Sequence, residues 1–451
     1  MWGSAKTRFT SELSVCAPMV DNPIASVYIG GNDQSTFRER KTCGSRERFC
    51  SDKPRRARGE PLKDSRWRTF AAAGIVAGGL CLLTTIFSLS LTEQSAATRD
   101  FIGYWAAGRQ IIHGTDPYDP QQVLRLEKAV GLGSLQIKIT PSPPVGLALV
   151  IPLGFLRAKS GLVFWMLAQV ACISVALWIL WLVQGRPNTR THLFGYLFAP
   201  ALACLMAGQL GIFCLLGIAV FLLWHDRRPF IAGAALLPLT LKPHLFLPVG
   251  LVLLFWVIWR RTPRVLVGLV AAMAASSAAV LLFDPQVWTQ YVGMMRSNLM
   301  RDRFAPTLSA YLRWDIAPSA VWLEYLPAGA ACVWALWYFW RRRDQWKWME
   351  HGLTVLLVSV MCAPYAWLTD EAVLLPAVLV GVYRAIDTRR SLLPIAIFCA
   401  AALIELYADV RITSWYYTWT TPAWLAWYLY ATRSSIAKAK SSDVDSAVQA
   451  G

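Results

Sequence analysis

Charge is scarce along most of this 451-residue sequence. Charged residues make up 16% of the chain and hydrophobic residues 56%, and the stretch 70–91 carries no charged side chain. A helix that faces water on one side needs a polar face, whereas an uncharged run of about 20 residues is long enough to cross a bilayer. The shortage of charge therefore argues against a soluble protein and indicates a polytopic integral membrane protein.

The motifs of soluble enzyme sites are also missing from the sequence. It contains no Gly-rich nucleotide-binding fingerprint, no metal-ligand cluster at a recognisable spacing, and no Ser/His/Asp constellation in any region of soluble size. We therefore expect no cofactor and no bound metal. Whatever this protein does, it is expected to do at the membrane.

The formal net charge of +17 comes from 44 Lys and Arg against 27 Asp and Glu. The basic residues lie in segments that alternate with apolar blocks, as the positive-inside rule expects of cytoplasmic loops. These segments are residues 1–68, 225–229, 259–264, 341–348, 384–390 and the C-terminal tail. The charge therefore indicates membrane topology, so membrane lipids are expected partners and nucleic acid is not.

Apolar segments follow one another between residues 70 and 431. The thirteen segments are 70–91, 144–157, 161–184, 193–207, 210–224, 230–241, 244–258, 265–283, 319–340, 352–368, 371–383, 391–408 and 415–431. Basic residues at both ends of the chain favour two cytoplasmic termini, which require an even number of crossings. One segment must then be re-entrant or interfacial, either the Pro-rich 144–157 or a half around Gly208-Gln209. The sequence predicts an all-α polytopic membrane protein with about twelve transmembrane helices.

Composition divides the chain into three parts. Residues 1–68 carry 14 Lys/Arg and 8 Asp/Glu with little apolar periodicity, which predicts a disordered basic cytoplasmic extension. Residues 69–431 form the transmembrane domain, and residues 432–451 form a cytoplasmic tail. The long connections 92–143 and 284–318 fall on the extracytoplasmic side and contain no cysteine, so no disulfide framework is expected there.

The segment Asp100–Asp119, with the sequence DFIGYWAAGRQIIHGTDPYD, follows the first apolar run directly. Asp100 opens a short amphipathic helical pattern, and glycine, proline and aspartate then turn the chain. A carboxylate at a membrane boundary is costly to desolvate, so it needs a partner or a function. It can cap the helix, and it can accept a proton in a reaction; the two roles are compatible.

Three further polar motifs fall at turns that the basic-loop count places on the outer face. Gly208-Gln209 separates two apolar halves, a pattern that a simple helix break also produces. Lys242 is either a snorkelling lysine beside a helix-breaking proline or a fixed cation for an anionic group. Asp370 and Glu371 either cap a helix and complement its dipole or line a site.

Taken in order, these motifs resemble the polyprenol-phosphate-mannose-dependent α-mannosyltransferase-like family, which includes enzymes that extend phosphatidylinositol mannosides. The resemblance runs from about residue 70 to residue 431. It rests on Asp100–Asp119, PSPP at 141–144, Gly208-Gln209, Leu241-Lys242-Pro243, and Pro364-Tyr365 with Asp370. His244 stands where the family often has Gln.

The resemblance implies a GT-C-type glycosyltransferase fold, with short extracytoplasmic amphipathic helices beside the transmembrane domain. It implies transfer of a hexose, mannose on the family's pattern, from a polyprenyl-phosphate donor to a lipid or glycan acceptor. The expected location is the inner cell membrane, with the active site on the extracytoplasmic face.

The chemistry of such a transfer needs few groups. The donor already carries a phosphate leaving group, so the enzyme needs a base for the acceptor hydroxyl and cations for the phosphate. The resemblance implies Asp100 as the base, and direct displacement with one base inverts the anomeric carbon. The expected phosphate contacts are Lys242, Arg109, Arg99 and His244, and the expected substrate contacts are Tyr104, Tyr118, Gln209, Tyr365 and Asp370.

Other functions fit parts of the pattern. A retaining double displacement could use Asp116 and Asp119, although DPYDP is first of all a turn sequence. A lipid-linked-sugar or polysaccharide transporter also has broken helices, but the charges here cluster at outward turns and no two-fold internal repeat is visible. A non-catalytic subunit of an envelope-assembly complex is the third alternative.

Overall fold

The computed structural model describes residues 63–133, 138, 140–297, 305–408 and 415–433. The chain divides into two units, Met1–Asp64 and Ser65–Gly451. The predicted disordered extension lies outside the described residues as far as residue 62, and residues 63–68 begin the helix α1 (Lys63–Ser90). The predicted tail lies outside them from residue 434 onward.

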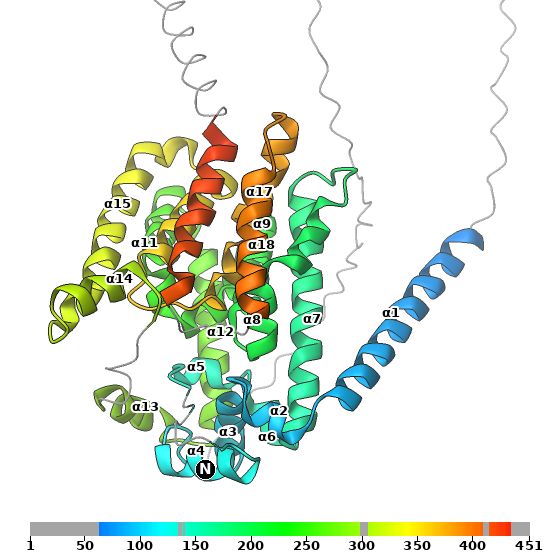
Figure 1. Cartoon of the computed structure of the whole chain (residues 1–451), viewed down its shortest axis with the longest axis vertical. Coiled ribbons are helices and arrows are strands. Elements are labelled where there is room, and N and C mark those ends of the chain that lie inside the picture. The colour runs from blue at the N-terminus through cyan, green and yellow to red at the C-terminus, as the bar shows by residue number, and fades with distance from the viewer. Residues whose placement is uncertain (1–62, 134–137, 139, 298–304, 409–414, 434–451) are drawn as a thin grey trace, which may run out of the picture. The chain divides into compact units, whose positions relative to one another are not determined.

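Within the described residues every regular element is a helix (Figure 1). The all-α prediction is therefore confirmed for this part of the chain. Among the described helices, three are long and apolar enough to cross a membrane, namely α7 (Ala158–Val183), α11 (Pro243–Arg260) and α12 (Arg264–Leu281). Shorter apolar helices cover Ala77–Ser90, Gly211–Trp224, Pro229–Leu241, Trp348–Met361 and Leu393–Tyr407. The number of twelve crossings stays a prediction.

Short helices follow α1, as expected of the connection 92–143. They are α2 (Glu93–Ala97), α3 (Phe101–Ile112) and α4 (Pro120–Ala129). α2 starts in a capping box in which Thr92 and Ser95 exchange hydrogen bonds. α4 starts at Pro120, where Asp119 Oδ1 accepts from the Gln121 amide at 2.8 Å.

The Pro-rich segment 144–157 does not form one spanning helix. It folds into α5 (Pro144–Leu147) and α6 (Ile151–Gly154), and a helix of four residues rises only about 6 Å. Gly108 of α3 and Gly154 of α6 let the two helices meet backbone to backbone, because a Cβ on Gly108 would lie 2.2 Å from the Val150 oxygen. α2, α3, α4 and α6 gather beside one end of α7 (Figure 1).

The rest of the chain forms helical hairpins and short turns around α7, α11 and α12. These elements are η1 (Thr191–Leu197), α8 (Ala199–Ala207), α9 (Gly211–Trp224), α10 (Pro229–Ala234), η2 (Leu237–Leu241), α13 (Val287–Arg296), α14 (Leu308–Tyr311), η4 (Leu312–Ile316), η5 (Val321–Tyr325), α15 (Leu326–Arg342), η6 (Arg343–Gln345), η7 (Trp348–Gly352), α16 (Leu353–Met361), η8 (Asp370–Leu374), α17 (Leu375–Asp387), α18 (Leu393–Tyr407) and η9 (Trp415–Trp419). A last helix covers residues 420–433.

Two large apolar cores and one small cluster lie within the described part of the chain. The larger core joins α9, α11, α16 and α17 around side chains such as Trp424 and Trp427, both fully buried. The smaller core packs α3, α5 and α6 against α7 around Phe101. Leu205 of α8 packs against both cores, so the turn that follows α8 is held from two sides.

Candidate active site

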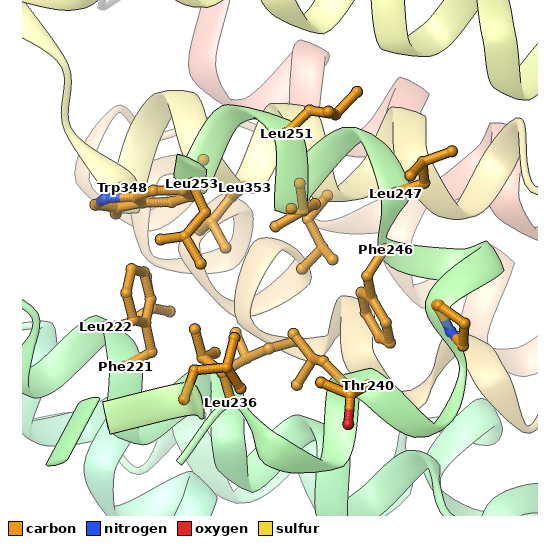
Figure 2. A pocket seen from close by; sticks show the side chains of 18 residues that line it. Phe221, Leu222, Leu236, Thr240, Phe246, Leu247, Leu251, Leu253, Trp348 and Leu353 are labelled. Atoms are coloured by element: carbon orange, nitrogen blue, oxygen red, sulfur yellow. The ribbon is translucent and has the colours of Figure 1, made fainter. Parts of the chain in front are cut away.

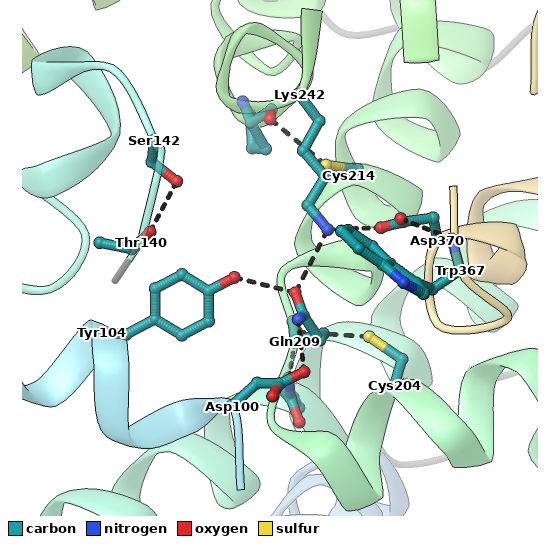
Figure 3. Close-up of polar contacts among 12 residues, drawn as sticks. Asp100, Tyr104, Thr140, Ser142, Cys204, Gln209, Cys214, Lys242, Trp367 and Asp370 are labelled. Atoms are coloured by element: carbon teal, nitrogen blue, oxygen red, sulfur yellow. Dashed lines mark hydrogen bonds and ion pairs between the residues drawn. The ribbon is translucent and has the colours of Figure 1, made fainter. Parts of the chain in front are cut away.

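Asp100 precedes the first residue of α3 but does not cap it. Its backbone is helical (φ −66°, ψ −20°), and its side chain accepts from none of the described helix amides. The carboxylate instead reaches across to the α8–α9 turn, where Oδ2 accepts a hydrogen bond of 2.7 Å from Gln209 Nε2 (Figure 3). The Asp100 side chain is 46% exposed, so the carboxylate is held in place and still open to a ligand.

The turn that carries Gln209 is fixed by its backbone. Gly208 has φ +72°, a conformation that glycine adopts at no steric cost, and a Cβ at this position would lie 2.8 Å from Cβ of Phe101. Trp165 Nε1 donates to the Gly208 carbonyl at 2.8 Å, and Gln169 donates to the Gln209 carbonyl. The close approach of Gly208 to α3 sets the Gln209 amide beside Asp100.

The Gln209 side chain joins two charges of opposite sign. Its Oε1 accepts from Lys242 Nζ at 3.2 Å and from Tyr104 Oη at 2.9 Å (Figure 3). An ammonium can only donate, so the amide oxygen must face Lys242 and the NH2 group must face Asp100. Burial raises the pKa of Tyr104, so this hydroxyl stays a donor at neutral pH.

Lys242 forms a buried ion pair with Asp370. The Lys242 side chain is 11% exposed and the Asp370 side chain 0%, and Asp370 Oδ2 also accepts from the Trp367 amide at 3.1 Å. Burial by itself lowers the pKa of Lys242, but the charge of Asp370 and its hydrogen bond with the ammonium outweigh burial and raise the pKa above its ordinary value. Lys242 is therefore a permanent cation one amide away from Asp100.

Lys138 is a site residue that the sequence did not reveal. Its Nζ lies 3.5 Å from Asp100 Oδ1 and donates to the Thr98 carbonyl at 2.7 Å. Its backbone amide donates to the Glu127 carboxylate at 3.2 Å, and Glu127 is fully buried. Lys138 sits in a connection without helical periodicity, so no pattern in the sequence places it beside Asp100.

The two arginines near Asp100 in sequence bind backbone carbonyls. The Arg99 guanidinium donates to the Met206 carbonyl, and Arg109 donates to the Gly154 carbonyl at 2.8 Å. Arg109 follows Asp100 by nine residues, and at about 100° per residue this places it on the opposite side of the helix. Arg109 thus ties α3 to α6 and is not brought together with the other site residues.

The remaining predicted contacts, His244, Tyr365 and Tyr118, have neighbours of their own. His244 stacks on Tyr365 with ring centroids 3.7 Å apart, and its Nε2 has no partner among the described residues. Tyr118 donates from Oη to the Ser142 carbonyl at 2.8 Å, so it supports the PSPP run. Asp116 Oδ1 accepts from the Tyr118 amide at 2.8 Å, which is the turn chemistry expected of DPYDP.

An apolar cavity of about 290 Å³ lies next to residues that flank Lys242 in the sequence. Thr240 and Pro243 line it, together with apolar side chains from α9, α11, α12 and α16. Figure 2 shows Phe221, Phe246 and Leu353 among them. A dry cavity of about 150 Å³ already binds a molecule the size of benzene. The cavity has the size and character for a stretch of lipid chain.

No group of three or more His, Cys, Asp or Glu that could hold a metal ion occurs in the described residues. The polar group consists instead of Asp100, Gln209, Lys242 and Asp370, with Tyr104 hydrogen-bonded to Gln209 (Figure 3). Lys138 joins it through its ion pair with Asp100. Such a set can remove a proton and bind an anion, which are the two needs of a transfer with a phosphate leaving group.

Gly103→Ala is expected to disturb this group through the Lys138 backbone. A Cβ at Gly103 would lie 2.0 Å from the Lys138 carbonyl oxygen, so the connection must move away from α3. We expect a loss of about 1–3 kcal/mol in the free energy of unfolding, measured by denaturant titration in detergent, together with lower activity. Gly293→Ala is the matched control, because nothing lies within 4 Å of a Cβ there; equal losses in both variants would contradict the packing argument.

A helical membrane protein with a half-exposed carboxylate and a buried cation at its helix turns fits the class of membrane glycosyltransferases. Comparison with family models supports this class: residues 142–364 match the model of Glycosyltransferase family 87. The matched region contains Gln209 and Lys242, whereas Asp100 and Asp370 lie outside it. A search of curated proteins gave no match, and neither did a search of solved structures.

Proposed function

We propose that this membrane glycosyltransferase moves a hexose, mannose by resemblance, from a polyprenyl-phosphate donor to a lipid or glycan acceptor. The observation that carries the proposal is the Gln209 bridge. It holds the Asp100 carboxylate at 2.7 Å on one side and the Lys242 ammonium at 3.2 Å on the other. A base and a cation are thus fixed one amide apart, as a proton acceptor and an anion contact must be.

In the proposed reaction Asp100 accepts the proton of the acceptor hydroxyl while that oxygen attacks the anomeric carbon. The bond from this carbon to the phosphate oxygen breaks, and its electron pair leaves with the phosphate. A hydroxyl is far less acidic than a carboxylic acid, so the proton moves late, as attack develops. With a single displacement the anomeric carbon is inverted, and a β-linked donor gives an α-linked product.

Lys242 is the proposed phosphate contact within the bundle. An ammonium has three N–H donors, and Lys242 gives one to Asp370 and one to Gln209, which leaves one for a phosphate oxygen. The apolar cavity beside Thr240 and Pro243 supports a lipid-linked donor. Tyr104, Tyr365 and His244 are proposed to line the sugar, and the site is proposed to face the extracytoplasmic side.

The sequence predicted Arg99 and Arg109 as phosphate contacts, but the proposal does not assign them this role. Each donates to a backbone carbonyl, and a guanidinium used in this way holds the fold. Tyr118 likewise supports the loop after α4 through Ser142. The proposed first contacts of the substrates are therefore Asp100, Lys242 and the groups that surround Gln209.

The test is sugar transfer by the purified protein in detergent, with a prenyl-phosphate-linked hexose as donor and a lipid extract as acceptor. Transfer needs no second compartment, whereas transport across a membrane does. Product formation that depends on both donor and enzyme supports the proposal. If the protein makes no product in detergent but translocates the lipid-linked sugar when it is reconstituted into vesicles, it is a transporter instead.

A further inference from the structure

Among the described cationic side chains close to Asp100, Lys138 is the one whose ammonium can leave its present contact and bind another group. Lys242 is paired with a carboxylate that is 0% exposed, and Arg99 and Arg109 bind backbone carbonyls. The Lys138 side chain is 27% exposed. Its contacts with Thr98 and Asp100 leave one of its three N–H donors with no partner in the described part of the chain.

The backbone of Lys138 is fixed although its side chain is accessible. Its amide donates to Glu127, a carboxylate with 0% exposure. Its carbonyl oxygen lies where a Cβ of residue 103 would be, which only glycine at Gly103 permits. The buried Glu127 carboxylate and the absence of a Cβ at Gly103 thus both fix the position of the Lys138 backbone. The ammonium at the end of the side chain can move while this backbone stays in place.

The direction of such a movement follows from the charges in the proposed transfer. When the acceptor proton reaches Asp100, the carboxylate loses its negative charge. At the same time the breaking bond gives one more negative charge to the phosphate. A cation that stays beside Asp100 favours the charged carboxylate and opposes the proton transfer. A cation that follows the charge to the phosphate stabilises the transition state.

We infer that Lys138 is a catalytic residue that contacts the departing phosphate of the donor, exchanging its contact with Asp100 for one with a phosphate oxygen as the proton is transferred. The inference rests on the proposed glycosyl transfer. It assigns two cations to the phosphate. Lys242 is bound to Gln209 and held in a buried ion pair, whereas the Lys138 side chain, beside Asp100, is able to move.

The test compares Lys138→Met, Lys138→Gln and Lys138→Arg in the full-length protein in detergent. The matched control is Lys128→Met, since Lys128 is an exposed lysine of α4. One assay measures kcat and KM for the prenyl-phosphate sugar. The other measures binding of farnesyl phosphate, a short form of the leaving group, by calorimetry, and thermal unfolding identifies any variant that fails to fold.

We expect Lys138→Met and Lys138→Gln to lower kcat about a hundredfold, the effect of removing one donor to a developing anion. They should also weaken farnesyl phosphate binding at least about tenfold. Lys138→Arg should recover a large part of both, because it keeps the charge, and Lys128→Met should change neither.

Wild-type binding of farnesyl phosphate in folded Met and Gln variants overturns the inference, whatever happens to kcat. This binding measurement does not require turnover. Lys138-dependent binding in a wild-type protein that transfers no sugar would support the phosphate contact and refute the proposed function. If the wild-type protein transfers sugar but the Lys138 variants bind farnesyl phosphate as tightly as it does, the proposed function is supported and the phosphate contact of Lys138 is refuted.

Discussion

Asp100→Asn is expected to reduce sugar transfer by at least about a hundredfold, the lower range for loss of a general base, while thermal unfolding changes little. Asparagine is nearly isosteric, and its side-chain oxygen can still accept from Gln209 Nε2. No cap is lost, because Asp100 accepts from none of the described amides of α3. The substitution therefore removes the ability to accept a proton and keeps the hydrogen bond with Gln209. It also removes the ion pair with Lys138, which is partly exposed and contributes little to stability.

Asp116→Asn is the matched control for this prediction. Its side-chain oxygen can still accept from the Tyr118 amide, and a role limited to the turn predicts near wild-type activity. Initial rates at saturating donor and acceptor decide the comparison. More than about a tenth of wild-type activity in Asp100→Asn would contradict the base assignment. A hundredfold loss in Asp116→Asn would instead favour a mechanism through that residue.

Lys242→Met is expected to destabilise the protein by about 3–5 kcal/mol, the cost of leaving one member of a buried ion pair without the other. The Asp370 carboxylate that remains is 0% exposed. Replacing both members by apolar residues of similar volume removes this penalty. Lys242→Met/Asp370→Leu should therefore regain most of the stability, measured as the free energy of unfolding in a denaturant titration in detergent.

Activity in the same pair of variants separates fold from chemistry. The double variant should be stable and still deficient in transfer, because the cation proposed to contact the phosphate is gone. Lys242→Arg should keep part of the activity, since charge is retained while the geometry of a single ammonium is not. If the stable double variant transfers sugar from the donor at the wild-type rate, the role of Lys242 is purely structural.

Four of the residues predicted to share a site lie close together in the structure. The basic loops predict that the turns at Gln209, Lys242 and Asp370 lie on one side of the membrane, together with Asp100. The structure brings these four residues into one hydrogen-bonded group. The alternation of apolar and basic segments carries this information because each hairpin returns its turn to the same face. Which face this is remains a prediction.

The sequence could not predict the contacts of residues that lie in irregular segments between helices. Lys138 reaches Asp100 from a stretch without periodicity, and its position depends on Glu127 and on the close packing at Gly103. Arg109 seemed close to Asp100 in sequence, but helical rotation takes it to the other side of α3, where it binds Gly154. Asp370 was expected to contact substrate, and it is fully buried against Lys242.

The lengths of apolar runs also predicted helices that are longer than those observed. The run 230–241 divides into α10 and η2. Pro238 lies in the first turn of η2, where proline begins a helix because it has no amide hydrogen to donate. Gly233 packs so closely on α12 that a Cβ would lie 1.8 Å from the Val265 oxygen. Hydrophobicity predicts where the chain is buried, whereas proline and close backbone contacts decide where a helix stops.

The central claim is a single displacement assisted by one base, and the anomeric configuration of the product tests it most directly. Purified wild-type protein is incubated with a β-linked prenyl-phosphate hexose and a lipid acceptor, and the new glycosidic bond is examined by NMR spectroscopy. Asp100 acting alone as the base predicts an α-linked product, formed with inversion. A β-linked product would show a double displacement through a second carboxylate and would contradict the account.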